Sequence, residues 1–182
     1  MRYIIGLFFT LGLIILILVL IFRGGATPPK HQINLGSYLN SGGTAQLIID
    51  GPITAESEHA EVQIDVSPDQ VSFTLYQGYQ QTVATQQTYP NNQSAYAVFL
   101  QALQHAGFTN GTTSGSSDER GYCPAGNRYI YSFMNEGDQL TRFWYTSCGN
   151  GNFRGSGDTI RWLFRQQVPD YDKLTLNKNI NG

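Results

Sequence analysis

The stretch VQIDVSPDQVSFTL, residues 62–75, is the part of the sequence that best defines the fold. On each side of Ser67–Gln70, every second residue is apolar. A period of two is typical of a strand that buries one face, and Pro-Asp between two such runs indicates a turn. The stretch therefore predicts a β-hairpin whose buried face carries Val62, Ile64 and Val66 on one strand and Val71, Phe73 and Leu75 on the other.

Further strands are predicted on both sides of this hairpin. Thr44–Asp50 is a short strand candidate, and Tyr79–Tyr89 is an amide-rich one. A second hairpin is predicted because Arg128–Met134 and Gln139–Ser147 flank a turn signal at residues 135–138. If Glu136 and Gly137 form the turn, the register places Tyr129 opposite Trp144, Tyr131 opposite Arg142, and Phe133 opposite Leu140.

Two helices complete the predicted domain. Ser94–Ala106 carries apolar residues at helical spacing and is followed by Gly107, a common residue just after a helix. Asp158–Val168 is the second helix, with Asp158 as the predicted N-cap and Pro169 just beyond its end. The order hairpin, helix, hairpin, helix predicts an α+β fold. We expect a mainly antiparallel sheet, two hairpins plus one or two extra strands, with two helices on one face.

An apolar N-terminal segment precedes this domain. Tyr3–Phe22 contains no charged residue, and as a helix it would span ~30 Å, the thickness of a bilayer core. Arg23 follows directly, and the segment lacks a clean small-x-small cleavage site. An uncleaved signal-anchor is therefore favoured over a cleaved signal peptide. We expect a single transmembrane helix within residues 1–22 that contacts the lipid bilayer through residues 3–22.

The rest of the chain divides into three parts by composition. Residues 23–43 are rich in Gly, Pro, Ser and Asn and are predicted to be a flexible tether. Residues 44–171 are predicted to form the α+β domain. Residues 172–182 are predicted to be a flexible tail.

The two cysteines, Cys123 and Cys148, bracket the second hairpin. The chain has no C-x-x-C motif and no histidine close to either residue in sequence, which disfavours a redox pair or a metal site. A structural disulfide is the favoured interpretation. Since such bonds persist in oxidising compartments, we expect the domain to lie outside the cytoplasm, at the cell membrane.

The charge of the chain disfavours one class of function, and it is unevenly distributed along the sequence. The formal net charge is −2, which disfavours binding to nucleic acid through positive charge. Residues 31–119 carry eight acidic residues and no Lys or Arg, whereas residues 120–182 carry eight basic and five acidic residues. If the two segments fold together, these charges complement each other across the sheet. If they form separate surfaces, the domain has one acidic and one basic face.

The second hairpin is rich in aromatic residues, and two interpretations are open. Tyr129, Tyr131 and Trp144 are core residues and cross-strand pairs in one of them. In the other, they form a partly exposed face with Arg142 that binds a glycan or a protein partner.

The glycine-rich loop Gly149–Gly157 is a weaker candidate for binding. Arg154 in the loop and Arg161 in the following helix are candidates to hold a carboxylate or phosphate. The lysine and hydroxyl residues of a P-loop are absent, and Asp158 adds a negative charge. The alternative is a loop whose glycines only permit tight turns.

Sequence motifs give little support to catalysis, and none indicates a cofactor or a metal. His59 lies among Glu56, Glu58 and Glu61, which form either a weak divalent-metal patch or a solvated acidic loop. We therefore expect a membrane-anchored extracytoplasmic module of the cell envelope that binds a protein or a glycan and is not an enzyme. The alternatives are a structural subunit of a membrane-associated assembly and an envelope hydrolase.

Overall fold

The computed structural model describes residues 33–112 and 118–180. The predicted anchor at residues 1–22 and the first part of the tether lie outside these residues. Within the two described ranges, no helix is both long enough and apolar enough to cross a membrane.

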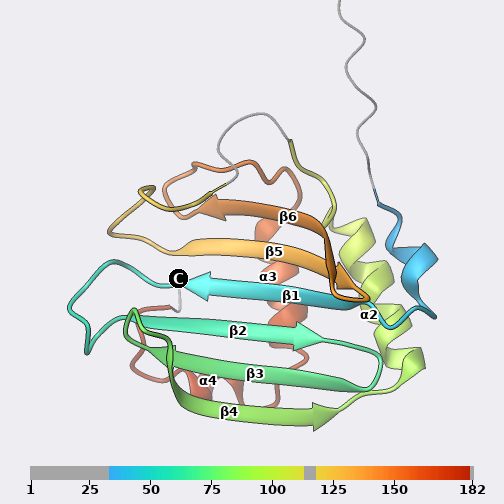
Figure 1. Cartoon of the computed structure of the whole chain (residues 1–182), viewed down its shortest axis with the longest axis horizontal. Coiled ribbons are helices and arrows are strands. Elements are labelled where there is room, and N and C mark those ends of the chain that lie inside the picture. The colour runs from blue at the N-terminus through green and yellow to red at the C-terminus, as the bar shows by residue number, and fades with distance from the viewer. Residues whose placement is uncertain (1–32, 113–117, 181–182) are drawn as a thin grey trace, which may run out of the picture. The chain divides into compact units, whose positions relative to one another are not determined.

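A six-stranded antiparallel sheet forms the body of the structure, which confirms the predicted α+β class (Figure 1). Its strand order is β4-β3-β2-β1-β5-β6. Both predicted hairpins are present, as β2–β3 and β5–β6, and the central pairing of β1 with β5 joins the two halves of the sheet. The strands are β1 (Thr44–Asp50), β2 (Ala60–Val66), β3 (Gln70–Gln77), β4 (Thr82–Pro90), β5 (Arg128–Asn135) and β6 (Asp138–Thr146).

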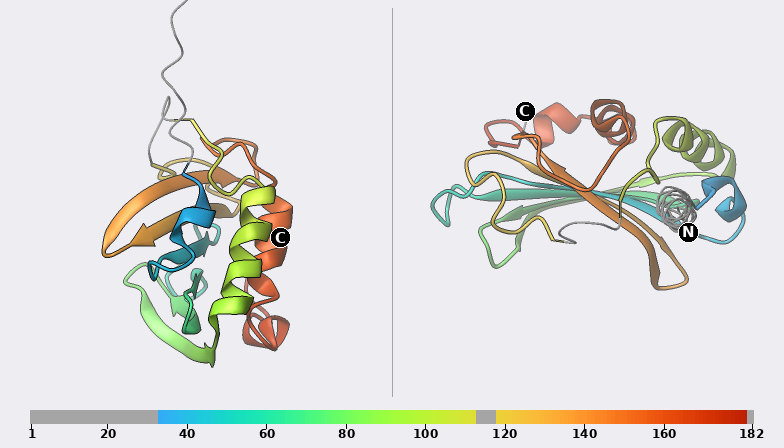
Figure 2. Two further views of the ribbon diagram at one scale, coloured as in Figure 1. Left: turned by 90° about the vertical axis from the view of Figure 1, so that its right-hand side faces the viewer. Right: turned by 90° about the horizontal axis from the view of Figure 1, so that it is seen from above.

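The helices gather on one face of this sheet, as Figure 2 shows. The core is the layer between them and the sheet, because alternate side chains of β1 and β2 are buried on that side. Phe99 of one helix and Phe164 of another meet edge to face over this layer, with ring centroids 5.2 Å apart. The helical segments are η1 (Leu35–Tyr38), α2 (Gln93–His105), α3 (Gly157–Arg165) and α4 (Tyr171–Leu174).

The end of α2 follows the sequence prediction. Gly107 has a φ of +77°, a conformation that residues with a Cβ rarely adopt. Its N–H donates to the Gln104 carbonyl at 3.1 Å, and the Phe108 N–H donates to the Leu103 carbonyl at 3.0 Å. This is the Schellman arrangement, and it places Phe108 in the core.

The start of α3 differs from the prediction. Ser156 occupies the N-cap position, and Asp158 lies inside the first turn, where it forms an ion pair with Arg161. An acidic residue in the first turn still interacts favourably with the helix dipole, so sequence alone did not separate the two positions. The helix ends at Arg165, although Val168 beyond it is buried as expected.

The register of the second hairpin also differs from the prediction. The expected pairing holds next to the turn, where Met134 lies opposite Gln139, but a bulge between Phe133 and Met134 shifts the rest by one residue. Tyr129 therefore pairs with Tyr145, and Trp144 pairs with Ile130. Since side chains alternate between faces, this shift moves the β6 residues to the face opposite the expected one.

Both predicted flexible segments contribute to the core. Leu35, in the predicted tether, is fully buried, and its N–H donates to the Gln104 side-chain oxygen at 2.8 Å. Ile180, in the predicted tail, is fully buried as well. The folded unit therefore extends beyond residues 44–171 at both ends.

Two neighbouring residues of β1 test which face of the sheet is the core. Leu47 is fully buried beneath the helices, whereas Ile48 is half-buried on the opposite face. We expect Leu47→Ala to lower the free energy of unfolding by about 2–5 kcal/mol, and Ile48→Ala to lower it by about 1 kcal/mol. Urea unfolding of the two variants, followed by circular dichroism, measures the difference. Equal losses would contradict this assignment of the faces.

Candidate functional site

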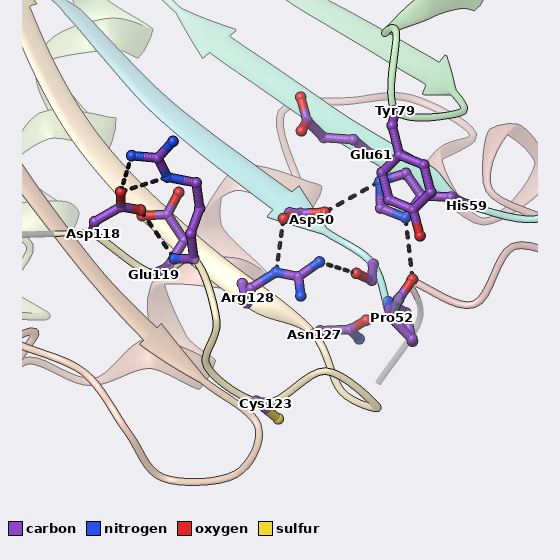
Figure 3. A network of polar contacts seen from close by, with 12 residues as sticks. Asp50, Pro52, His59, Glu61, Tyr79, Asp118, Glu119, Cys123, Asn127 and Arg128 are labelled. Atoms are coloured by element: carbon purple, nitrogen blue, oxygen red, sulfur yellow. Dashed lines mark hydrogen bonds and ion pairs between the residues drawn. The ribbon is translucent and has the colours of Figure 1, made fainter. Parts of the chain in front are cut away.

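A hollow of about 280 Å³ lies at one end of the sheet face that carries no helix. Chain segments far apart in sequence form its walls. Its lining includes five acidic, basic or histidine side chains and one tyrosine. Figure 3 shows most of the polar contacts that organise it. The lining residues are Asp50, Ile53, His59, Glu61, Gly78, Tyr79, Gln81, Arg120, Gly121 and Arg128.

Strand register places three charged residues of the hollow in one row. Asp50 is the last residue of β1, and it lies opposite Glu61 of β2 on one side and Arg128 of β5 on the other. Residues directly opposite each other on paired strands project to the same face. Ile49 faces the helices, so this row projects to the face that carries no helix.

Arg128 anchors the row. Its side chain is only 5% exposed, and its Nε donates to Asp50 Oδ2 at 2.7 Å. Its Nη2 donates to the Gly51 carbonyl at 2.5 Å. A buried guanidinium needs such partners, because an unpaired buried charge is strongly destabilising. The pair therefore fixes the position of the Asp50 carboxylate.

His59 occupies the other side of Asp50 and is 5% exposed. Its Nδ1 lies 3.1 Å from the Pro52 carbonyl oxygen, and its Nε2 lies 3.4 Å from Asp50 Oδ1. Tyr79 stacks on the imidazole with ring centroids 4.1 Å apart, as is visible in Figure 3. The Tyr79 hydroxyl donates to the Thr54 carbonyl at 2.8 Å, which ties the β3–β4 turn to the loop before β2.

Glu61 is the carboxyl group of the hollow without an ion pair among the described residues. Its neutral partner is Gln81, whose amide donates to Glu61 Oε1 at 3.0 Å. Burial raises the pKa of Glu61 to about 7, and the negative charge of Asp50 adds to this shift. The hollow therefore contains a carboxyl group that changes charge near neutral pH.

Arg120, which lines the hollow, and Arg142, which does not, each form an ion pair. Arg120 is paired with Asp118, and its side chain is 87% exposed. Arg142 Nη2 donates to Glu119 Oε2 at 2.6 Å. Both basic residues are thus balanced by acidic ones, whereas Glu61 has no ion pair among the described residues.

The aromatic candidates from the second hairpin lie in the interior. Tyr129 and Trp144 are 2% exposed and Tyr131 is fully buried. Tyr129 stacks on Tyr145 at 4.8 Å between ring centroids, and Tyr122 covers Trp144 at 5.0 Å. Tyr129 and Tyr131 thus belong to the core beneath the helices, whereas Trp144 is buried on the opposite face of the sheet.

The arginine candidates are dispersed, and each has partners within the chain. Arg142 is paired with Glu119, and Arg154 Nη1 donates to the carbonyls of Gly151 and Phe153 at 2.9 and 2.8 Å. The Arg161 guanidinium lies 4.2 Å from the centroid of the Tyr129 ring. Because Leu140 is the extra residue of a bulge in β6, Tyr129 and Tyr131 lie on the helix side of the sheet and Trp144 and Arg142 on the other, so the six candidates do not form one surface.

The predicted disulfide between Cys123 and Cys148 is present, with Cα atoms 5.7 Å apart. It fastens the loop that carries Arg120, Gly121 and Tyr122 to the end of the second hairpin. The covalent link thereby supports one wall of the hollow.

Sequence reasoning missed the row formed by Asp50, Glu61 and Arg128. In sequence these residues resemble the polar side of amphipathic strands. The one sequence signal for the row is that Asp50 lies at the end of one predicted strand and Glu61 near the start of the next, where antiparallel pairing brings them together. His59 is buried and stacked, unlike a residue of a solvated acidic loop. Over the part of the chain that the structure describes, no group of three or more His, Cys, Asp or Glu side chains could hold a metal ion.

In comparisons with known proteins, no family model and no curated protein sequence matches this chain.

The raised pKa of Glu61 makes stability depend on pH. The folded chain holds the Glu61 proton up to about pH 7, whereas the unfolded chain releases it near pH 4.5. Folded protein therefore binds more protons across this window, and this contribution to stability is lost as the pH rises through it. Glu61→Gln removes the loss, so we expect the variant to gain about 1–2 kcal/mol over the parent at pH 8 and nothing at pH 4.

Denaturant unfolding of parent and variant at the two pH values measures this difference. Glu58→Gln is the matched control, because Glu58 is exposed and does not line the hollow. An equal effect of Glu61→Gln at pH 4 and pH 8 would show that the Glu61 carboxyl is not held in its neutral form by the fold.

Proposed function

We propose that this chain is a single-pass membrane-anchored module of the cell envelope whose folded domain lies outside the cytoplasm and binds a protein partner. The apolar segment Tyr3–Phe22 supports the anchor. The disulfide supports an oxidising compartment, since cytoplasmic thiols are kept reduced.

The binding site in this proposal is the hollow around Glu61. The observation that carries it is a half-buried carboxyl group that has no ion pair among the described residues and lines a hollow with other polar side chains. Burial of a carboxylate is unfavourable unless it gains a partner. The ring of Tyr79 and the aliphatic side chain of Ile53, both about half exposed, provide apolar surface beside it.

A lysine side chain of the partner protein suits this site best. Its ammonium group would pair with Glu61, while its aliphatic part would lie along Tyr79 and Ile53. The segment of the chain that forms most of the hollow, residues 31–119, contains no Lys or Arg of its own. The two arginines that line the hollow, Arg120 and Arg128, are each paired with an aspartate, so the unpaired Glu61 favours a basic partner over an acidic one.

Titration of the full chain in detergent micelles with a tetralysine peptide tests the proposal. We expect shifts of the backbone amides of Gly78, Tyr79 and Gln81, and at least tenfold weaker binding for Glu61→Gln. Since the pKa of Glu61 is about 7 and only its ionised form pairs with lysine, binding should strengthen about tenfold between pH 6 and pH 8.

The controls separate this site from general attraction between opposite charges. Glu58→Gln removes the same charge from the neighbouring loop and should leave binding within twofold of the parent. A tetralysine peptide whose terminal amine and four side-chain amines are all acetylated carries no positive charge and should not bind. Equal losses for the two variants, or binding of a chito-oligosaccharide in place of the peptide, would contradict a lysine site at Glu61.

A hydrolase is the second candidate, and one observation favours it. Asp50 and Glu61 bring two carboxyl groups into one hollow, and the pKa of Glu61 lies in the range of a general acid. Pairs of this kind cleave glycosidic bonds. Release of reducing sugar from envelope glycans by the parent, abolished in Glu61→Gln, would favour this function over binding alone.

A further inference from the structure

The two edges of the sheet differ in how their outer backbone groups are satisfied. Along β6, the N–H groups of Asn152 and Phe153 both donate to the Trp144 carbonyl at 3.0 Å. The Trp144 N–H donates to Asn152 Oδ1 at 2.8 Å, and the Thr146 N–H donates to the Asn150 carbonyl at 2.8 Å. The loop after β6 thus covers this edge over its second half.

The opposite edge, β4, is uncovered. It is the outermost strand in Figure 1, and every residue of Thr82–Pro90 is exposed or half-exposed. Within the described ranges, the backbone of these residues forms hydrogen bonds to no element other than β3. A row of free N–H and C=O groups is a template for a further strand.

The geometry identifies which groups of β4 are free. The Asn91 N–H donates to the Asp69 carbonyl at 2.9 Å, so this pair is hydrogen-bonded within the β3–β4 ladder. Since backbone direction alternates along a strand, the N–H and C=O groups of Gln86 and Thr88 point away from β3. Pro90, which has no N–H, occupies the next outward position, where a proline does not interrupt the ladder.

The composition of β4 offers little protection against strand pairing. Its sequence, TVATQQTYP, contains no Lys, Arg, Asp or Glu, whereas proteins commonly place charges on exposed edges. The inner strands β1 and β2, by contrast, carry Asp50, Glu61 and Asp65. Nine residues is also long for an edge strand.

We propose that β4 is a self-association surface at which a second copy of this chain adds its own β4 in antiparallel orientation. The regular part of β4 is Thr85–Tyr89. Before it, Ala84 has no partner in β3 because the register shifts there, and after it comes Pro90, which has no N–H. Gln87 is the centre of this segment. A twofold axis at Gln87 pairs Gln86 with Thr88 of the second copy and Thr88 with Gln86.

A second copy suits this edge for two reasons. The pairing about Gln87 matches each outward-facing residue with another outward-facing residue, so that about four backbone hydrogen bonds form. Antiparallel pairing about Gln87 also places side chains of the same strand in the two copies opposite each other, which is unfavourable where those side chains carry like charges. The neutral Gln and Thr side chains of β4 avoid this repulsion and can form hydrogen bonds with each other.

Disulfide cross-linking of the full chain in detergent micelles tests the pairing. Both native cysteines are in the intrachain disulfide, so Gln87→Cys introduces a single free thiol. At the twofold axis the two introduced residues form a non-hydrogen-bonded pair with Cα atoms about 4.5 Å apart, within the range of a disulfide. We expect a covalent dimer on a non-reducing gel after mild oxidation.

Gln101→Cys is the matched control, because Gln101 is an exposed glutamine on α2. We expect its dimer yield to be at least fivefold lower than that of Gln87→Cys. Addition of Gln86→Lys and Thr88→Lys to the Gln87→Cys chain should lower the yield to that of the control, since each lysine would face another lysine. Circular dichroism confirms that these variants remain folded.

Two results would overturn the proposal. The first is a yield for Gln87→Cys no higher than for Gln101→Cys. The second is a yield that the lysine substitutions leave unchanged, which would assign the contact to another part of the chain. Hydrogen exchange of the unsubstituted chain is a measurement free of mutation: the amides of Gln86 and Thr88 should exchange more slowly as protein concentration rises, and no change would contradict pairing at this edge.

Discussion

The pairing of β1 with β5 is the interaction on which the rest of the structure depends. These strands are separated along the chain by a hairpin, a strand, a helix and a long loop, so their association closes a large loop at a cost in chain entropy. Burial of Leu47 and Ile49 beside Tyr129 and Tyr131 offsets this cost. The same register brings Asp50 to Arg128, and hence creates one wall of the hollow.

The β1–β5 pairing brings together the acidic and the basic parts of the sequence. Acidic residues dominate up to residue 119 and basic residues after it, and the central strand pair brings the two segments together. Asp50 with Arg128 and Glu119 with Arg142 both connect an acid of the first segment to a base of the second. Glu61 has no such counterpart among the described residues, and this leaves the local excess of negative charge on which the proposed function rests.

Much of the fold could be predicted because its signals are local. The alternation in residues 62–75 and the helical spacing before Gly107 involve neighbours in sequence, and β1 matches its predicted limits, Thr44–Asp50. The bulge, in which Leu140 of β6 is the extra residue, has no local signal, because aromatic residues lie on both faces of β6 and its sequence fits either register. That single inserted residue is why Tyr129 and Trp144 do not share a face.

The site could not be predicted for a related reason. Asp50, His59, Tyr79 and Arg128 come from four segments, and none of them is unusual within its own segment. Their contacts depend on two strand registers and on the turn that stacks Tyr79 over His59. Sequence patterns identify which residues face the core, but the partners of a polar residue on the other face depend on distant parts of the chain.

The disulfide has a consequence for the thermodynamics of binding. The loop that carries Arg120 and Gly121 to the hollow is fastened to the end of β6 by Cys123 and Cys148. Its conformational freedom is therefore reduced before any ligand arrives, which lowers the entropy lost on binding. Reduction would return that freedom to the loop, so affinity at the proposed site would depend on the redox potential of the surroundings even though neither cysteine lines the hollow.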